Sequence, residues 1–247
     1  MNHFMILSFL FSIGSFLGWI LEAVYRRFIS DSNPERKWIN PGALIGPCLP
    51  LYGVSLILLY LLARLELYLP IGEPALCKAV LFIAMAICIT VVEYITGLIF
   101  IVKFKMRLWD YSQNRFNIKG IICPLYTFYW MILSAIYYFF IDPHILKALN
   151  WLAENPAFSF FIGFFYGIFA VDVFISARDW LKISDFAKDN KIIVRLEELK
   201  SQIRSFKDQQ KESLRFILAL RSSANIREHL QRYKEKLSAI GISRAKK

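Results

Sequence analysis

Five long apolar segments alternate with short polar ones over the first 180 or so residues of the chain. They run over residues 4–21, 39–63, 79–102, 120–141 and 155–177, and the only charged residues inside them are Glu93 and Asp172. Because about 20 apolar residues of helix cross the ~30 Å hydrocarbon core of a bilayer, this pattern predicts spanning helices. We place five of them, at about residues 4–25, 42–64, 78–102, 120–141 and 156–178, in a transmembrane domain of residues 1–181.

The last part of the chain, residues 182–247, has a different pattern. Apolar residues recur there every three or four positions between charged ones, in two runs: Leu196, Leu199, Ile203 and Phe206, then Ile226, Leu230, Tyr233, Leu237 and Ile240. This spacing predicts a helical tail that pairs with another helix or forms a coiled coil, and self-association through the tail is one outcome. A hairpin of two helices and a helix lying on the membrane surface are alternatives. The predicted fold class is therefore an all-α membrane protein of about five transmembrane helices with a C-terminal cytoplasmic helical tail.

Composition and charge agree with this division. Hydrophobic residues make up 57% of the chain and charged ones 20%, whereas soluble domains have about 45–50% and about 25%. These values exclude a disordered, collagen-like or disulfide-framework protein. The tail has 17 basic and 8 acidic residues, and the preceding residues have 13 and 11. A basic tail attached to a bilayer favours anionic lipid as its partner, and we expect no nucleic acid.

The basic residues between the spans predict the topology. Four lie in the first connection, at Arg26, Arg27, Arg36 and Lys37, and five lie between residues 103 and 119. The two alternate connections, residues 65–77 and 142–154, contain one base between them. Because basic loops stay in the cytoplasm, we expect the N-terminus outside and the tail in the cytoplasm.

An internal repeat emerges when the two basic loops are compared. In the first half, Glu22 is followed by a basic loop and the run N-P-G-A-L-I-G-P-C-L-P-L-Y of residues 40–52; in the second, Glu93 is followed by a basic loop and N-I-K-G-I-I-C-P-L-Y of residues 117–126. The two halves predict a tandem two-helix repeat with a pseudo-two-fold axis along the membrane normal. The alternative is that Pro and Gly recur by chance where helices begin.

Three carboxylates, Glu22, Glu93 and Asp172, lie toward the predicted cytoplasmic ends of spans one, three and five. Ionised groups in a span are costly and usually face a bundle interior or cavity, so these three are candidates for a polar transport pathway. The alternative is structural, with each carboxylate pairing with a base such as Arg26 or Lys103 near the interface.

The second basic loop contains the aromatic and polar run R-L-W-D-Y-S of residues 107–112. Trp109 is expected to anchor at the lipid headgroups, and Asp110 and Asn117 are expected to cap helix starts. A docking or re-entrant loop is the alternative.

Neither the four cysteines, Cys48, Cys77, Cys88 and Cys123, nor the three histidines have the spacing of a metal site, so we expect no metal or cofactor. The sequence also contains no phosphate-binding loop and no hydrolase motif. We therefore expect no enzymatic activity of the chain itself.

Four motifs in order carry a family resemblance: G-W-I-L-E (residues 18–22), N-P-G-x-x-x-G-P-C-x-P-x-Y-G (40–53), E-Y-I-T-G (93–97) and L-W-D-Y-S-x-x-x-F-N-I-x-G (108–120). Over about residues 4–141 the chain resembles the bacterial Putative ABC-transporter type IV family, also called CmpB-like. It departs from the family pattern at residues 38–42, where Arg-Gly is common, and at Leu49, which separates Cys48 from Pro50.

The resemblance implies a permease subunit in the bacterial plasma membrane, with a cytoplasmic ATPase as partner. Two other functions fit the sequence: a membrane scaffold that recruits partners through its tail, and a self-contained channel or secondary carrier.

Overall fold

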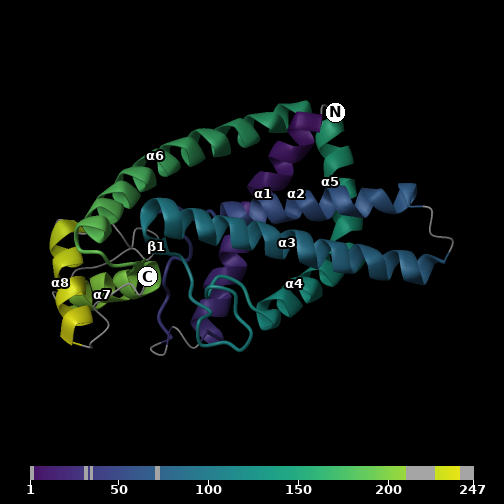
Figure 1. Cartoon of the computed structure of the whole chain (residues 1–247). Coiled ribbons are helices and arrows are strands. Elements are labelled where there is room, and N and C mark those ends of the chain that lie inside the picture. The colour runs from purple at the N-terminus through teal and green to yellow at the C-terminus, as the bar shows by residue number, and fades with distance from the viewer. Residues whose placement is uncertain (1–2, 31–32, 34–35, 70–72, 210–225, 240–247) are drawn as a thin grey trace. The chain divides into compact units, whose positions relative to one another are not determined.

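A computed structural model describes residues 3–30, 33, 36–69, 73–209 and 226–239 (Figure 1). Five of its helices or continuous helical runs are long and apolar enough to cross a membrane, as the sequence predicts. They are His3–Phe28, Pro50–Tyr68, Pro74–Phe104, Pro124–Glu154 and Pro156–Asp189. The described chain divides into two compact units.

The helices of these runs are α1 (His3–Phe28), α2 (Pro50–Leu65), α3 (Pro74–Phe104), α4 (Pro124–Ile136), α5 (Asp142–Glu154) and α6 (Ser159–Asp189). Single turns of 3₁₀-helix, Glu66–Tyr68 and Pro156–Phe158, follow α2 and precede α6. Two short strands, β1 (Met106–Arg107) and β2 (Val194–Arg195), pair in parallel with Met106 opposite Val194. The tail contributes α7 (Leu196–Gln209) and α8 (Ile226–Ala239).

The second predicted span begins later than expected. Residues 42–49, which the prediction placed in the helix, form an irregular loop, and α2 begins at Pro50. Proline lacks the N–H that a helix interior needs and disfavours the helical conformation of the residue before it. Pro41, Pro47 and Pro50 therefore keep this segment out of a regular helix, and Gly42 adopts a φ of 76° that favours glycine.

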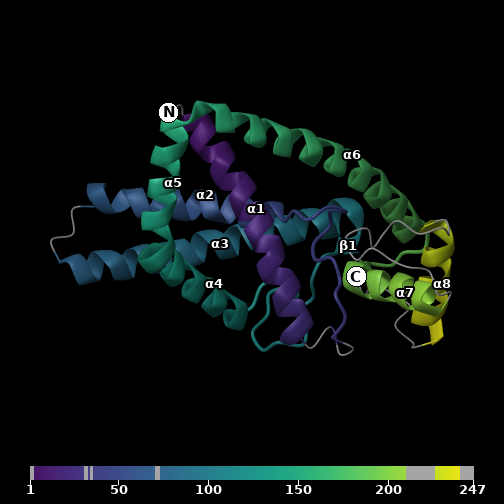
Figure 2. The ribbon, with the colours of Figure 1, turned by 180° about the vertical axis from the view of Figure 1, so that it is seen from behind.

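The fourth predicted span is longer than expected and is bent. It starts at Pro124, passes through a π-helical turn at Tyr137–Ile141 and continues as α5, so residues 142–154 are helical instead of a loop. Figures 1 and 2 show the change of direction between α4 and α5. Pro143 cannot donate the usual helical hydrogen bond, and a π turn is one way for a helix to absorb such a break.

The first unit comprises Met1–Leu17, Pro50–Thr96 and Tyr111–Gly167. In it α2 and α3 run antiparallel (Figure 1). Its core joins side chains from α1, α2, α3, the α4–π run and α5: Leu10, Leu59, Ala63, Met85, Ile89, Trp130, Tyr137, Ile145 and Leu149.

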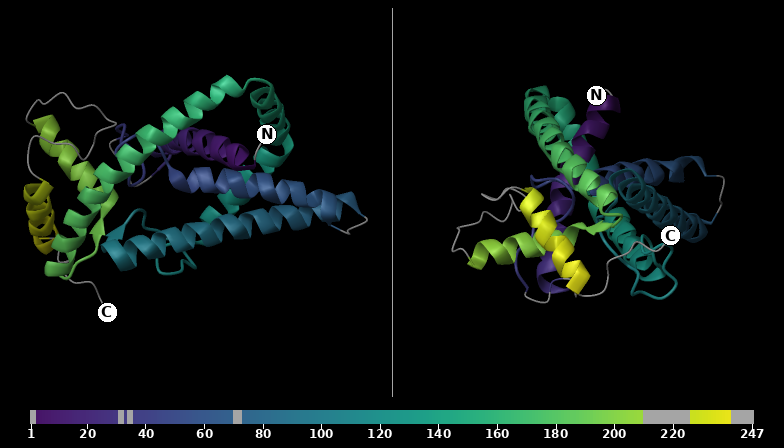
Figure 3. Two further views of the ribbon diagram at one scale, coloured as in Figure 1. Left: turned by 90° about the horizontal axis from the view of Figure 1, so that it is seen from above. Right: turned by 60° about the vertical axis from the view of Figure 1, so that its left-hand side comes forward.

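The second unit comprises Gly18–Leu49, Gly97–Asp110 and Ile168–Lys247. Its core combines β1 and β2, the end of α6 and the tail helices, and includes Met106, Ile183, Val194, Leu199, Ile203, Leu230 and Tyr233. Figure 3 shows α8 lying across α7. The Tyr233 hydroxyl of α8 accepts a hydrogen bond from the backbone N–H of Arg195 at 3.0 Å.

Five of the predicted tail seam residues are buried in this core: Leu196, Leu199, Ile203, Leu230 and Tyr233. The side chains of Phe206, Ile226 and Leu237, and Ile240 altogether, lie outside the described residues. The coiled coil, the internal repeat and the domain boundary at residue 182 stay predictions.

Candidate functional site: a polar network around the loop 40–46

The loop of residues 40–46 is folded around the side chain of Asn40, which is 1% exposed. Its amide nitrogen donates to the carbonyl oxygens of Leu44 (3.3 Å) and Ile45 (2.8 Å). Its amide oxygen accepts from the indole N–H of Trp19 at 2.6 Å. The loop has no regular ladder to satisfy its backbone, so a side-chain amide takes that place.

Asp172 of α6 binds the C-terminal end of this loop. Its two carboxylate oxygens accept the backbone N–H groups of Ile45 and Gly46, each at 3.1 Å. The hydroxyl of Ser176 also donates to Asp172, at 3.2 Å. A Cβ at position 46 would lie 2.8 Å from a carboxylate oxygen, so an alanine there would require the Asp172 side chain to shift. The carboxylate in the fifth span is therefore an acceptor for loop backbone.

Lys200 of α7 binds the N-terminal end of the loop and is 3% exposed. Its Nζ donates to the carbonyl oxygens of Asn40 (3.0 Å) and Gly42 (2.6 Å). The indole N–H of Trp180 donates to the carbonyl of Ala43 at 2.9 Å. Burial of the amine, with a smaller contribution from the positive charge of Arg26, lowers the pKa of Lys200 to about 7, and Asp172 opposes that shift.

Lys200 is not among the site residues predicted from the sequence. One signal was present: Lys200 follows Leu196 by four positions and precedes Ile203 by three, which puts it on the apolar face of the tail helix. A charged residue on that face needs a polar partner, but nothing in the pattern indicates that the partner is a loop 160 positions earlier in the chain.

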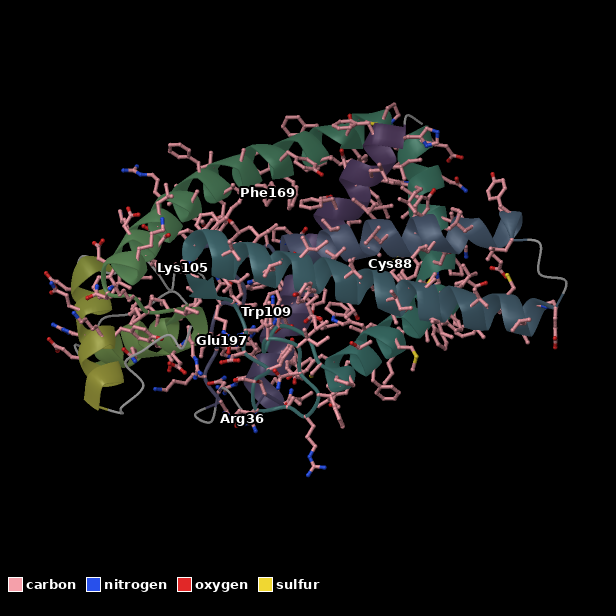
Figure 4. The ribbon with its side chains drawn as sticks, viewed as in Figure 1. Arg36, Cys88, Lys105, Trp109, Phe169 and Glu197 are labelled. Atoms are coloured by element: carbon pink, nitrogen blue, oxygen red, sulfur yellow. The ribbon has the colours of Figure 1, made fainter. Side chains whose placement is uncertain are left out.

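Glu22 of α1 forms an ion pair with Arg26 one turn later, at 2.9 Å. Arg26 also pairs with Glu197 of α7, labelled in Figure 4. Glu197 and Lys200 are three positions apart, so one stretch of α7 contacts both Arg26 and the loop. The second unit thus joins Glu22 and Asp172 to one polar network through α7.

Glu93 lies in the first unit and is 2% exposed. Its carboxylate accepts the indole N–H of Trp130 and the hydroxyl of Tyr111, each at 3.1 Å. The ring of Tyr111 stacks on Tyr126 with centroids 4.0 Å apart. The predicted repeat makes Glu22 and Glu93 equivalent, but the contacts seen in the structure differ: Glu22 pairs with an arginine, whereas Glu93 accepts from an indole and a phenol.

Each of the three loop candidates makes contacts within its own unit. Trp109, labelled in Figure 4, packs against the core of the second unit. Asp110 pairs with Arg107 at 2.7 Å and with Arg195 at 3.1 Å. No helix begins in residues 111–123, so Asp110 does not cap a helix start.

Asn117 closes a turn instead of capping a helix. Its side chain accepts from the N–H of Gly120 at 2.9 Å and donates to the carbonyl of Asn114 at 2.8 Å. The N-cap residue of α4 is Cys123, because Pro124 begins the helix. The turn instead presents Phe116, which is 86% exposed and which the sequence analysis did not single out.

Within the described ranges, His, Cys, Asp and Glu side chains form no group of three that could hold a metal ion. The site is a hydrogen-bonded polar network, and its chemistry is that of ion pairing and proton binding.

A family model described as Putative ABC-transporter type IV matches residues 9–177. The match includes the loop 40–46, Glu22, Glu93 and Asp172, and it ends before Lys200. No curated protein and no solved structure matches the chain.

Proposed function

We propose that this chain, which belongs to the Putative ABC-transporter type IV family, is the membrane-spanning permease subunit of an ATP-driven transporter. Five helices long and apolar enough to cross a membrane support a membrane subunit. The proposal places it in the bacterial inner membrane, with its N-terminus outside and its tail in the cytoplasm, because the basic connections and tail favour that orientation.

Glu22, Glu93 and Asp172 are the proposed pathway residues. The observation that carries this part of the proposal is the burial of Glu93, a carboxylate 2% exposed within the apolar helix α3. Burying a carboxylate is costly even when it is hydrogen-bonded, and residues of this kind in spans usually serve a substrate or ion path. Asp172 in the fifth span and Glu22 in the first span are the other two carboxylates of the proposed pathway.

The second basic loop is the proposed contact for the ATPase. It presents Phe116 at 86% exposure and Ile118 at 53%. Asn117 holds the turn between them, and Phe116 has a φ of 56°, a backbone conformation that bulky residues rarely adopt. A rigid turn that exposes an aromatic side chain suits an anchor in a partner's pocket.

A pull-down tests this assignment. The tagged full chain, purified in mild detergent from its own cells, is expected to bring down a protein with a phosphate-binding loop and ATPase activity. Phe116→Ser is expected to lower the yield of that protein about tenfold or more, because aromatic anchors dominate interfaces. The matched control is Leu67→Ser, an equally exposed apolar residue (80%) on the predicted external side, which should leave the yield unchanged.

Absence of any such ATPase from the wild-type preparation would contradict the permease assignment. Recovery of another class of protein that depends on the tail would favour the scaffold. Solute flux through the purified chain alone, in vesicles without ATP, would favour a channel or secondary carrier.

A further inference from the structure

Lys200 combines three properties that the proposed transport role does not use. It is 3% exposed, it lies outside the residues that the family model matches, and it binds a loop inside them. Its Nζ contacts two backbone carbonyls, those of Asn40 and Gly42, at 3.0 and 2.6 Å. One amine of the tail thus holds a loop that belongs to the residues matched by the family model.

The two acceptors suit a neutral amine. A neutral amine has two N–H donors, which match the two carbonyl oxygens, whereas an ammonium has three donors and a positive charge. Taking that charge out of water costs free energy that carbonyl dipoles only partly return. Burial in the closed contact therefore makes the amine bind a proton less tightly than it does in water.

The charged groups around the amine come from three helices. Arg26 of α1 repels a proton on Lys200, and Asp172 of α6 attracts it. On α7 itself, Glu197 pairs with Arg26, and Arg204 donates to the backbone carbonyl of Trp38 next to the loop. Burial outweighs the attraction of Asp172, which leaves the pKa of Lys200 at about 7.

We propose that Lys200 is the proton-binding group of a latch: α7 closes on the loop 40–46 when the amine is neutral and is released when the amine takes up a proton. The latch goes beyond the proposed function and does not depend on it, since it needs neither an ATPase nor a substrate.

The direction of the pH effect follows from the two pKa values. In the released state Lys200 is in water, with a pKa near 10.4. In the closed state the pKa is about 7. Closing therefore releases a proton between these values, and the closing equilibrium strengthens as pH rises, by up to tenfold per pH unit. Below about pH 7 both states are protonated, so closing is weakest there and no longer depends on pH.

Hydrogen–deuterium exchange on the full chain in lipid nanodiscs tests the latch. Protection factors, corrected for the intrinsic pH dependence of exchange, are measured for peptides covering residues 40–46 and 196–204 between pH 6 and pH 9. We expect protection of both to rise by up to about tenfold per unit above pH 7 and to level off below it. Peptides from α5 report on the first unit and should not follow this profile.

Three variants separate the latch from simple packing. Lys200→Met is neutral and Lys200→Arg is charged throughout this range, so both should flatten the pH profile, and Lys200→Arg should lower protection at pH 9. The matched control, Lys234→Met on the exposed side of α8, should keep the wild-type profile. Circular dichroism and the α5 peptides show whether each variant is folded.

A wild-type profile with equal protection at pH 6 and pH 9 would overturn the proposal. So would a Lys200→Met profile that keeps the wild-type pH dependence. Either outcome would leave the permease assignment standing, because the ATPase pull-down tests that separately.

Discussion

At the scale of single residues, the buried and partly buried titratable side chains of this protein are held by polar groups of the chain. Two backbone N–H groups bind Asp172, an indole and a phenol bind Glu93, and two carbonyls bind Lys200. Such hydrogen bonds offset part of the cost of removing a charge from water. Removing the charge or its partners should therefore lower the stability of the protein more at these positions than at an ion pair on the surface.

The contrast between Glu93 and Glu22 gives a prediction. Glu93→Gln leaves two buried donors with a weaker, neutral acceptor and is expected to cost about 1–3 kcal/mol of stability. Glu22→Gln breaks a partly exposed ion pair with Arg26, and such pairs are typically worth about 0–1 kcal/mol. Thermal unfolding of the two variants in the same detergent should show the larger drop for Glu93→Gln.

The same variants test the pathway proposal through transport. If both carboxylates line the path, each substitution should abolish transport while the protein still accumulates in the membrane. Normal transport by the double variant would refute the pathway role and leave the structural role.

At the scale of elements, glycine sets how closely α1 and α2 approach. A Cβ at Gly53 would lie 2.7 Å from the backbone carbonyl oxygen of Phe11, and one at Gly14 would lie 2.8 Å from the Cβ of Leu56. Backbone atoms cannot move aside as a side-chain end can. The two helices therefore depend on small residues at their contact, a common device in membrane helices.

Gly53→Ala is accordingly expected to destabilise the first unit. The new methyl group must push α1 away from α2, at a cost of about 1–3 kcal/mol typical of overpacking. The matched control is Gly163→Ala in α6, where a Cβ meets nothing within 4 Å. That change should be neutral or stabilising by about 0.5–1 kcal/mol, because alanine favours helix. Equal melting temperatures for the two variants in detergent would argue against the close contact.

At the scale of the whole molecule, tail and membrane helices share one unit. Leu199 and Ile203 of α7 are buried with Met106 of β1 and Ile183 of α6, all at 0% exposure. The tail is thus part of a core in the second unit. Which connections face the cytoplasm stays a prediction, and chemical labelling can test it.

Single-cysteine labelling of a variant without the four native cysteines tests the predicted topology. Gln113→Cys, in the second basic loop, should react only with a reagent that enters the cytoplasm. Asn150→Cys, on α5, should react with an impermeant reagent from outside, because it lies in the predicted external connection. Both positions are exposed, so neither is hidden by packing. Labelling of Gln113→Cys from outside would invert the topology and place the ATPase contact on the wrong side.

The sequence by itself determined the membrane class, five apolar segments and the family. Apolar runs of 18 to 25 residues with at most one charged residue are long enough to cross a bilayer as helices. A helix suits the bilayer because it satisfies its own backbone hydrogen bonds. The ordered motifs between Gly18 and Gly120 were also sufficient for the family, which the match to residues 9–177 confirms.

Only the tertiary structure decided what the polar residues bind. Asp172 meets Ile45 and Gly46 across more than 120 positions, and Lys200 meets Asn40 and Gly42 across about 160. The start of α2 at Pro50 was likewise missed, since hydropathy does not distinguish an apolar loop from an apolar helix. The continuation of α4 into α5 was missed because the charged and polar residues of 142–154 resemble a loop although they continue a helix. Periodicity reports which face of a helix is apolar. A hydrogen bond between distant segments depends on how the chain packs, and no local pattern contains that information.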